Sequence, residues 1–451
     1  MKELSQKLER LIETAVEKEE IAGANIVVIR DGQEMAFAAD GYADIEAGKK
    51  YERDTIARLY SMTKPVTSAA AMLLMERGLL DPGAFVEEFL PGFHNAIVAS
   101  GGKLVPTVRP VRICDLLNMT SGLMYGGDVT SVCSMETEKL FDRIKEHLYL
   151  EDAMTTQEVA NRLGLIPLQF QPGESFQYGT SADVLGAVIE VISGKTFGEF
   201  LKEEFFEPLD MEDTAFYVPE NKQERLAKVY QRTEQGLELY TENHLGIMNA
   251  MKQVPAFESG GAGLVSTLDD YAKFAAMLLQ EGSYQGKQIL KPQTVHYMTN
   301  GSLMSWQQEV LDQCWEGIRG YTYANLLRIQ KEPGKSPMFT SIGESKIPLG
   351  LLIFSSVLNI FMDLWMVAGL DLGVFGAALA TLIAQGISAV FSLLIFFHRM
   401  RRYKSPFDWF DRQELYSMLQ IAVPSVLQQS TVSIGMMIVQ AVVNPFGTQA
   451  L

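Results

Sequence analysis

The chain has 451 residues, which is long enough for two or three domains. Its formal net charge of −17 at pH 7 comes from the first part, because residues 345–451 contain six Lys/Arg and five Asp/Glu, which leaves 32 basic and 50 acidic residues in 1–344. This acidity argues against a nucleic-acid partner, since the phosphate backbone attracts cationic surfaces.

The cysteines and histidines indicate neither a disulfide framework nor a metal site. Cys114, Cys133 and Cys314 form no CxxC pair, a pattern typical of free thiols in a reducing compartment. The five histidines are scattered along the chain, and no HExxH motif occurs. We therefore expect no metal and no cofactor.

The first elements in chain order are an amphipathic helix and a β-hairpin. Apolar residues at three- and four-residue spacing over 4–16 predict the helix, which has no apolar region typical of a secretory signal. Two apolar runs joined by Asp31-Gly32 predict the hairpin. Strands then alternate with helices expected over 61–79, over 181–206 and from about Thr267, which indicates a mixed α/β domain of the size of an enzyme.

The stretch "LYSMTKPVTSAAAMLLMERG" contains a serine and a lysine that would share one helix face, Ser61 and Lys64. A serine hydroxyl is a weak nucleophile at neutral pH and needs an adjacent base. A lysine amine can be that base when burial or a cationic neighbour lowers its pKa. The positive end of a helix favours the alkoxide and disfavours the ammonium. Taken alone, the pair is a weak signal, because Ser and Lys are common, and an ordinary capped helix explains it better.

Five stretches together resemble, in the same order, the serine β-lactamase-like family of class C β-lactamases, DD-peptidases (penicillin-binding proteins) and β-lactamase-like carboxylesterases. They are "SMTKPVTSAAAMLLMERGLLD", "VRICDLLNMTSGL", "FQPGESFQYGTSADVLGAVIE", "ESGGAGLVSTLDDYAKFAAMLL" and "GKQILKPQTVHYM". The resemblance covers about residues 5–343. It implies an α/β (α+β) β-lactamase/DD-peptidase-like fold and acyl-enzyme hydrolysis of a small-molecule ester, amide or β-lactam.

The resemblance also implies three catalytic roles. Ser61 matches the acylated nucleophile and Lys64 its activating partner. Tyr178 matches the tyrosine of the second motif, which shares the general-base role and returns a proton to the leaving group. Read without the family, Tyr178 is also compatible with an exposed loop tyrosine. Thr180 stands where β-lactamases have an asparagine, which favours the esterase-like members.

The family's third motif, Lys/His-Thr-Gly or Trp-x-Gly in esterases, does not follow Gly343-Glu344. In the family this motif lies on the strand beside the nucleophile and supplies one of two oxyanion donors. Similar esterases continue as Gly-Glu-Phe-Gly-Trp, whereas this chain continues as Ser-Lys-Ile-Pro-Leu-Gly. We therefore expect a hydrolase domain over 1–343 that is truncated at its C-terminal end and catalytically impaired.

The character of the sequence changes at residue 344. Three long apolar stretches predict transmembrane helices and hence an all-α membrane part, 349–370, 374–397 and 419–446. A buried core helix is the alternative for any one of them. In the second stretch Gly376, Ala380, Ala384 and Ser388 form a row of small residues, which lets another helix approach closely.

The stretch "GESKIPLGLLIFSSVLNIFMDLWMVAGLDLGVFGAALATLIAQGISAV" resembles the fifth and sixth spans of multidrug and toxic compound extrusion (MATE) transporters, and "LYSMLQIAVPSVLQQSTVSIGMMIVQAVVNPFGTQAL" the start of the seventh. The resemblance implies a partial MATE-type drug/cation antiporter segment over 344–451. The two families resemble each other at the junction, so we interpret the chain as a chimera or as the product of a gene-prediction or assembly error, and not as an evolved two-function protein. The alternative is a xenobiotic-antiporter fragment with a non-catalytic β-lactamase-like domain.

The basic loop "HRMRRYK" predicts the topology, because positively charged loops face the cytoplasm. It indicates a multi-pass plasma-membrane protein, with the lipid bilayer as partner and residues 1–344 in the cytoplasm. Reporter fusions after Lys404 and after Gly373 should therefore report inside and outside respectively. Two reporters on the same side would show that the prediction is wrong.

Overall fold

The computed structural model describes residues 2–30, 32–314, 318, 320–332, 354, 358–362, 364–369 and 373–400. The chain divides into two compact units, Met1–Lys331 and Glu332–Leu451, and each is described by itself. The junction expected between 343 and 344 lies outside the described residues.

The first unit opens with the helix and the hairpin that the sequence predicts. Helix α1 (Lys2–Glu17) packs against β2 (Gln33–Asp44), which pairs antiparallel with β1 (Gly23–Arg30). The short β3 (Lys49–Lys50) pairs with the other edge of β2, so the strand order is β1-β2-β3. Among the described strands, β1 therefore pairs with β2 alone and has one open edge.

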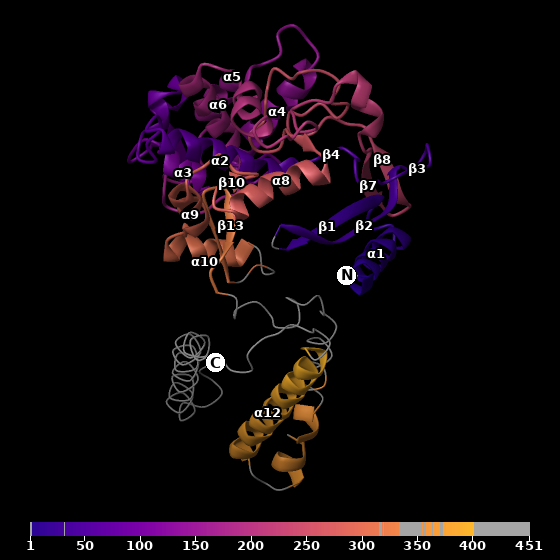
Figure 1. Cartoon of the computed structure of the whole chain (residues 1–451). Coiled ribbons are helices and arrows are strands. Elements are labelled where there is room, and N and C mark those ends of the chain that lie inside the picture. Colours follow the sequence, from indigo (N-terminus) through magenta and orange to yellow (C-terminus); the bar gives the residue numbers. More distant parts are fainter. Residues whose placement is uncertain are drawn as a thin grey trace. The chain divides into compact units, whose positions relative to one another are not determined.

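The body of the unit is a helical layer built around α2 (Thr63–Glu76) and α6 (Ser181–Ser193), which contact each other (Figure 1). Ala69, Ala70 and Ala71 are fully buried on α2, and such small side chains allow close helix packing. Four further helices complete the layer, α3 (Ile113–Leu117), α4 (Val132–His147), α5 (Thr156–Gly164) and α7 (Phe197–Leu201). The single helix expected over 181–206 is interrupted at Gly194, whose φ of 67° ends α6.

Short antiparallel strand pairs connect the helices. They are β4 (Ala57–Arg58) with β9 (Val265–Ser266), β5 (Ile97–Ser100) with β6 (Lys103–Pro106), β7 (Val229–Thr233) with β8 (Gly236–Tyr240), β10 (Ser283–Tyr284) with β11 (Lys287–Gln288), and β12 (Tyr321–Ala324) with β13 (Leu327–Gln330). Three more helices follow β9 in the chain, α8 (Leu268–Leu279), α9 (Pro292–Asn300) and α10 (Ser305–Cys314). Single turns of helix lie at η1 (Tyr60–Met62), η2 (Val86–Glu88), η3 (Pro91–Phe93), η4 (Lys202–Phe206) and η5 (Glu220–Arg225).

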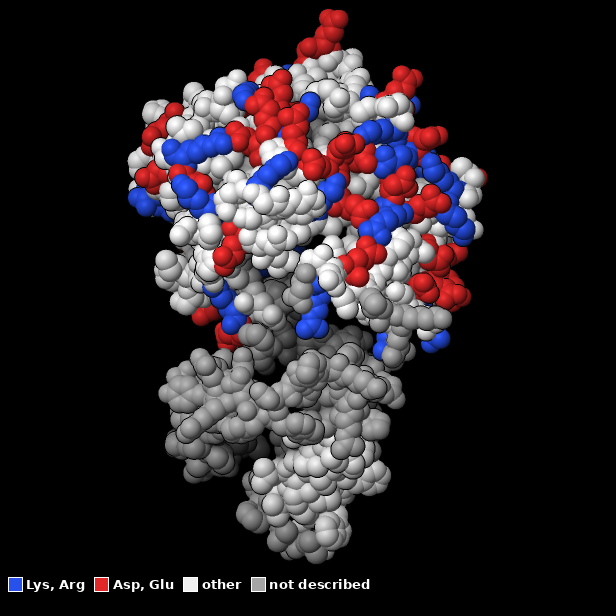
Figure 2. Space-filling model, viewed as in Figure 1, with Lys and Arg blue, Asp and Glu red and all other residues white. Residues whose placement is uncertain are grey.

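Acidic and basic side chains are intermixed over the viewed face of the first unit (Figure 2). Several form ion pairs, such as Arg77 with Glu204 at 2.6 Å and Arg225 with Asp213 at 2.7 Å. Ion pairs at the protein surface contribute at most about 1 kcal/mol each when they are exposed to solvent. The excess of acid therefore bears on solubility more than on the fold.

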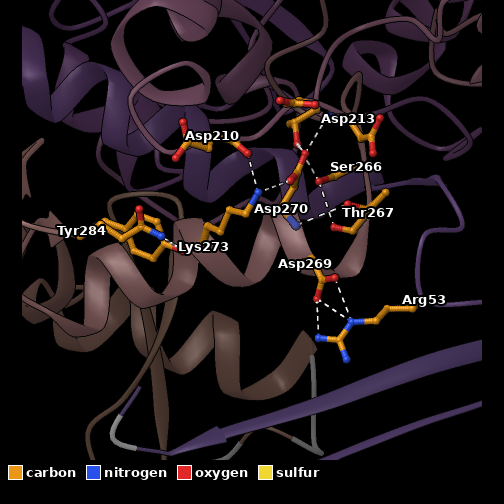
Figure 3. Close-up of polar contacts among 12 residues, drawn as sticks. Arg53, Asp210, Asp213, Ser266, Thr267, Asp269, Asp270, Lys273 and Tyr284 are labelled. Carbon is orange, nitrogen blue, oxygen red and sulfur yellow. Dashed lines mark hydrogen bonds and ion pairs between the residues drawn. The ribbon is translucent and has the colours of Figure 1, made fainter. Parts of the chain in front are cut away.

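Helix α8 is anchored at its first turn (Figure 3). The Thr267 hydroxyl accepts a hydrogen bond from the backbone N–H of Asp270 at 3.4 Å, so Thr267 is the N-cap. Asp269, in the same first turn, pairs with the Arg53 guanidinium at 2.8 Å, and Arg53 also pairs with Glu34 of β2 at 2.6 Å. Arg53 therefore links the N-terminal hairpin to α8.

A groove of about 420 Å³ lies between β1 and α8 and has a mainly apolar lining. Val27 and Ile29 contribute from β1, and Leu279 lines it from the end of α8. Leu279 is 81% exposed and Met62, which also lines the groove, is 49% exposed, so the groove is open to solvent. It extends from the hairpin to the residue that follows Ser61.

In the second unit, η8 (Leu364–Gly369) contacts α12 (Gly373–Met400), which covers the stretch expected at 374–397. Ala380 and Ala384 of the small-residue row are buried. Among the described residues, no helix is long and apolar enough to cross a membrane. The described parts of 349–370 are not one α-helix either, because 364–369 is a π-helical turn. Neither expected span is supported as a membrane span, and 419–446 lies outside the described residues.

Candidate active site

Ser61 lies in the η1 turn that leads directly into α2. The preceding residue, Tyr60, has a φ of 45°, a left-handed conformation that costs a non-glycine residue roughly 1–2 kcal/mol. Upstream of it, the backbone N–H of Leu59 donates to the carbonyl of Leu264 at 2.8 Å, which continues the pairing of β4 with β9. The nucleophile predicted from the sequence thus sits on a strained turn fixed by a strand pair.

Lys64 is 1% exposed, and its Nζ makes three polar contacts. It lies 3.3 Å from Ser61 Oγ, 3.2 Å from the Tyr125 hydroxyl and 2.9 Å from the Gly261 carbonyl oxygen. When this amine is neutral, it has two N–H groups and one lone pair. The carbonyl can only accept, so it takes one N–H, and the tyrosine oxygen can take the other. The lone pair is then left for the Ser61 hydroxyl, which is the geometry of a general base.

Tyr178 presents the face of its ring to the same amine. Lys64 Nζ lies 4.7 Å from the centroid of the Tyr178 ring, close enough for a cation–π interaction when the amine is charged. The ring also packs against Tyr125 and Tyr323, with centroids 6.2 Å and 6.0 Å away. The structure thus brings Ser61, Lys64 and Tyr178 together. The role of Tyr178 as proton donor to the leaving group stays a prediction.

Tyr125 is a site residue that the sequence patterns did not single out. Burial raises the pKa of its hydroxyl well above the usual value, so the group stays protonated over the ordinary pH range. It comes from the loop after Thr120-Ser121-Gly122, far from α2 in the sequence. Its position directly behind the Thr-Ser-Gly turn of the second family-like stretch was the available signal.

Asp183, at the start of α6, fixes the backbone segment at Gly261 whose carbonyl accepts from Lys64. Its Oδ1 accepts hydrogen bonds from Ser259 Oγ at 2.5 Å and from the Gly261 N–H at 3.0 Å. Burial raises the pKa of this carboxyl, while the hydrogen bond from Ser259 and the charge of Lys64 oppose the rise. A Cβ at position 261 would lie 2.8 Å from Asp183 Oδ2 and 2.9 Å from the Tyr125 hydroxyl, so glycine is needed there.

These residues are suited to acyl transfer. Ser61 is exposed to solvent, whereas the amine beside it is buried. An exposed hydroxyl next to a positioned base can attack a carbonyl carbon and form an acyl-enzyme. No group of three or more His, Cys, Asp or Glu side chains in the described part of the chain could hold a metal ion.

The fold and the site define a serine hydrolase of the Ser-x-x-Lys type. The chain belongs to the Beta-lactamase family, whose family model matches residues 8–324. Protein Rv1367c of Mycobacterium tuberculosis is 33% identical over 328 residues, which cover 71% of this chain and 78% of that protein. Esterase EstB of Burkholderia gladioli is 32% identical over 281 residues, 59% of this chain and 68% of the esterase.

Solved structures agree with this assignment. EstCE1, described as a hydrolase with promiscuous acyltransferase activity, matches with a TM-score of 0.61 and 26% identity, over 74% of this chain and 84% of its own. A penicillin-binding protein homologue from Pyrococcus abyssi shares the fold, with a TM-score of 0.53, 24% identity, and coverage of 72% of this chain and 64% of its own. The expected β-lactamase/DD-peptidase-like fold is confirmed. The matched family model ends at residue 324 and gives no support to a transporter fragment over 344–451.

The contact between Lys64 and Ser61 predicts where the chain reacts with electrophiles. A fluorophosphonate should label Ser61 of the full chain, and Ser61→Ala should abolish the adduct. Lys64→Met should slow labelling by about 100-fold or more, because a general base contributes on that order. Ser68→Ala, on the same helix, is the matched control and should leave the rate unchanged. Mass spectrometry locates the adduct, and one found on another serine would contradict the assignment.

Glu258 directly precedes the turn that binds Lys64 and is buried near Glu190. Its Oε2 accepts the Gly198 N–H at 2.6 Å, while Glu190 Oε1 accepts the Phe197 N–H at 3.1 Å. Burial raises the pKa of Glu258 to about 7, and the neighbouring Glu190 charge acts in the same direction. At neutral pH the folded chain therefore holds a carboxyl that resists ionisation.

This raised pKa predicts how stability depends on pH. Because the folded pKa of about 7 exceeds the ordinary value of 4.5, the free energy of unfolding should fall as pH rises from 4.5 to 7 and then level off. Glu258→Gln keeps an acceptor for Gly198 and removes the charge. It should raise the free energy of unfolding at pH 8 by roughly 3 kcal/mol and change it little at pH 4.5.

Urea denaturation of the full chain at the two pH values measures the effect. Glu234→Gln, on the exposed turn between β7 and β8, is the control and should change stability equally little at both. A Glu258→Gln variant with the same pH dependence as the unaltered chain would contradict the prediction.

Proposed function

We propose that this chain carries the site of an esterase-like acyl hydrolase that uses Ser61 as its nucleophile. The observation that carries the proposal is the position of Lys64 Nζ among Ser61 Oγ, the Tyr125 hydroxyl and the Gly261 carbonyl. The similarity to Esterase EstB supports an ester as substrate. An amide or a β-lactam is the second choice.

Thr180 supports the preference for esters. It stands where the β-lactamases of this family have an asparagine, and its hydroxyl is buried without a hydrogen-bond partner among the described residues. A buried threonine at this position offers a substrate no side-chain amide. Recognition of a β-lactam would therefore lack one of the groups that the family uses for it.

In the proposed reaction, Lys64 Nζ takes the proton of Ser61 Oγ while the oxygen attacks the ester carbonyl carbon. The tetrahedral intermediate collapses with loss of the alcohol, which receives a proton from Lys64 or through Tyr178. Water then attacks the acyl-enzyme, giving up a proton to the same base, and the acid leaves as Ser61 regains its proton. The residues named here are sufficient for each proton transfer.

The site is incomplete in the hydrogen-bond donors that would stabilise the oxyanion. In the family, one donor is the N–H of the nucleophile and the other lies on the third-motif strand, which the sequence after Glu344 does not provide. The open groove between β1 and α8 reaches Met62, beside the nucleophile. A strand bound in this groove could pair with the free edge of β1 and bring a backbone N–H toward Ser61.

The missing donor predicts that this chain turns over p-nitrophenyl esters and nitrocefin negligibly. Losing one oxyanion donor costs about 100- to 1,000-fold in rate, or roughly 3–4 kcal/mol. Replacing the residues after Glu344 with a family-like C-terminal segment that contains Trp-x-Gly should restore ester hydrolysis. Ser61→Ala in the repaired chain is the control. Turnover by the unaltered chain that Ser61→Ala abolishes would show that the third motif is not required.

For residues 344–451, the partial MATE-type antiporter stays a proposal that rests on the sequence resemblance alone. The same holds for the plasma-membrane location with a cytoplasmic hydrolase domain. A long sequencing read across the codons for Ser341 to Pro348 tests whether the two parts are joined in one gene. A read in which the hydrolase-like sequence continues past Glu344 to a third motif would establish the chimera.

A further inference from the structure

A small cavity of about 250 Å³ lies beside β4, the strand that leads to the nucleophile. Its walls are β4, the segment 226–229, the end of β8 and the segment 249–252. Arg58, Lys228 and Lys252 line it, together with polar and apolar residues but no Asp or Glu. We call it the Arg58 pocket. A lining with three basic residues and no acidic one contrasts with a chain whose net charge is −17.

Arg58 has no acidic partner among the described residues. Its Nη1 donates to the carbonyl of Ala227 at 2.6 Å and its Nη2 to the carbonyl of Asn249, while its Nε is buried without a hydrogen-bond partner. Burial lowers the pKa of Arg58, whereas paired carboxylates raise the pKa of Arg53 and Arg225. A partly desolvated cation without a counter-ion is unfavourable, so its position here points to a ligand that supplies the anion.

The backbone that holds Arg58 is itself fixed. The N–H of Ala227 donates to the carbonyl of Ile56 at 2.9 Å, which ties the segment 226–229 to the start of β4. The N–H of Asn249 donates to Asn243 Oδ1 at 2.9 Å, and its side-chain amide donates to the Tyr240 carbonyl at 2.8 Å. The guanidinium therefore keeps one orientation before any ligand arrives, which reduces the entropy lost on binding.

The pocket lies within reach of the nucleophile. Arg58 precedes Ser61 by three residues, so their Cα atoms are at most about 11 Å apart. Tyr60 lies between them and interacts electrostatically with Arg58 and with Tyr240, which also lines the pocket. Arg58 also lines the groove between β1 and α8, which reaches Met62 beside the nucleophile, so a ligand held at Arg58 could extend toward Ser61 along this groove.

We propose that the Arg58 pocket binds a carboxylate on the substrate, so that the preferred substrates are esters with a free carboxylate a few bonds from the ester group. This deepens the proposed function of Ser61 and rests on it. A planar carboxylate fits the fork of a guanidinium, and a single negative charge meets less repulsion from this acidic chain than a phosphate dianion would. Lys228 and Lys252 are exposed and would attract the anion toward the pocket.

Equilibrium binding to the full chain with Ser61→Ala tests the proposal, because this variant cannot consume an ester. Isothermal titration calorimetry compares monomethyl glutarate, a half-ester with one carboxylate, with dimethyl glutarate, its neutral analogue. We expect the half-ester to bind about tenfold more tightly. Arg58→Met should remove this preference, and Lys228→Gln with Lys252→Gln should reduce it several-fold. Lys18→Gln with Lys103→Gln, two exposed lysines outside the pocket, is the matched control and should leave it unchanged.

Three results would overturn the proposal. One is equal affinity for the two glutarate esters. Another is a preference that stays undiminished in the Lys228 and Lys252 double variant, which leaves Arg58 and its packing intact. The third is a competition experiment in which inorganic phosphate binds as tightly as the half-ester and displaces it. Such a result would show that the pocket binds anions in general. Failure of a fluorophosphonate to label Ser61 would instead refute the proposed function and leave the carboxylate site standing.

Discussion

The burial of the Lys64 amine is the interaction on which the rest of the first unit depends. An amine that is 1% exposed has lost its water and must find its partners within the protein. Those partners come from the start of α2, from the loop at Tyr125 and from the turn at Gly261. Three segments far apart in the sequence must therefore meet at one nitrogen atom, and the packing of α2 on α6 serves this requirement.

The same constraint explains why the surrounding residues are small or rigid. Gly261 leaves no room for a side chain beside Asp183 and Tyr125, and Ala69–Ala71 allow the helices to approach. Asp183 fixes the turn whose carbonyl accepts from Lys64. The placement of the backbone thus determines the site, and Tyr60, directly in front of the nucleophile, adopts a strained left-handed conformation.

Local patterns predicted the local features of this structure. The three-residue spacing of Ser61 and Lys64 predicted that the two side chains lie on one face of a helix turn. The spacing of apolar residues predicted α1 and the hairpin. The break at Gly194 was visible as a glycine but not as a helix end, since glycine also occurs within helices. Tyr125 had only its position after the Thr-Ser-Gly turn as a signal. Asp183 and the Gly261 carbonyl were not predicted, because no periodicity records which distant segments converge. The apolar stretches after 344 were predicted to be membrane spans from their length, their apolar composition and their resemblance to a transporter family, and the described side chains do not support that prediction.

The buried carboxyl of Glu258 makes folding a proton-linked reaction. Near pH 6 the folded chain keeps a proton on this group, whose pKa is about 7, while an unfolded chain with the ordinary value of 4.5 has lost it. Each molecule that unfolds at this pH therefore releases close to one proton from this group into the medium. A calorimeter also records the heat released when the buffer takes up that proton. The apparent enthalpy of unfolding therefore differs between phosphate and an amine buffer, although the same structure unfolds in both.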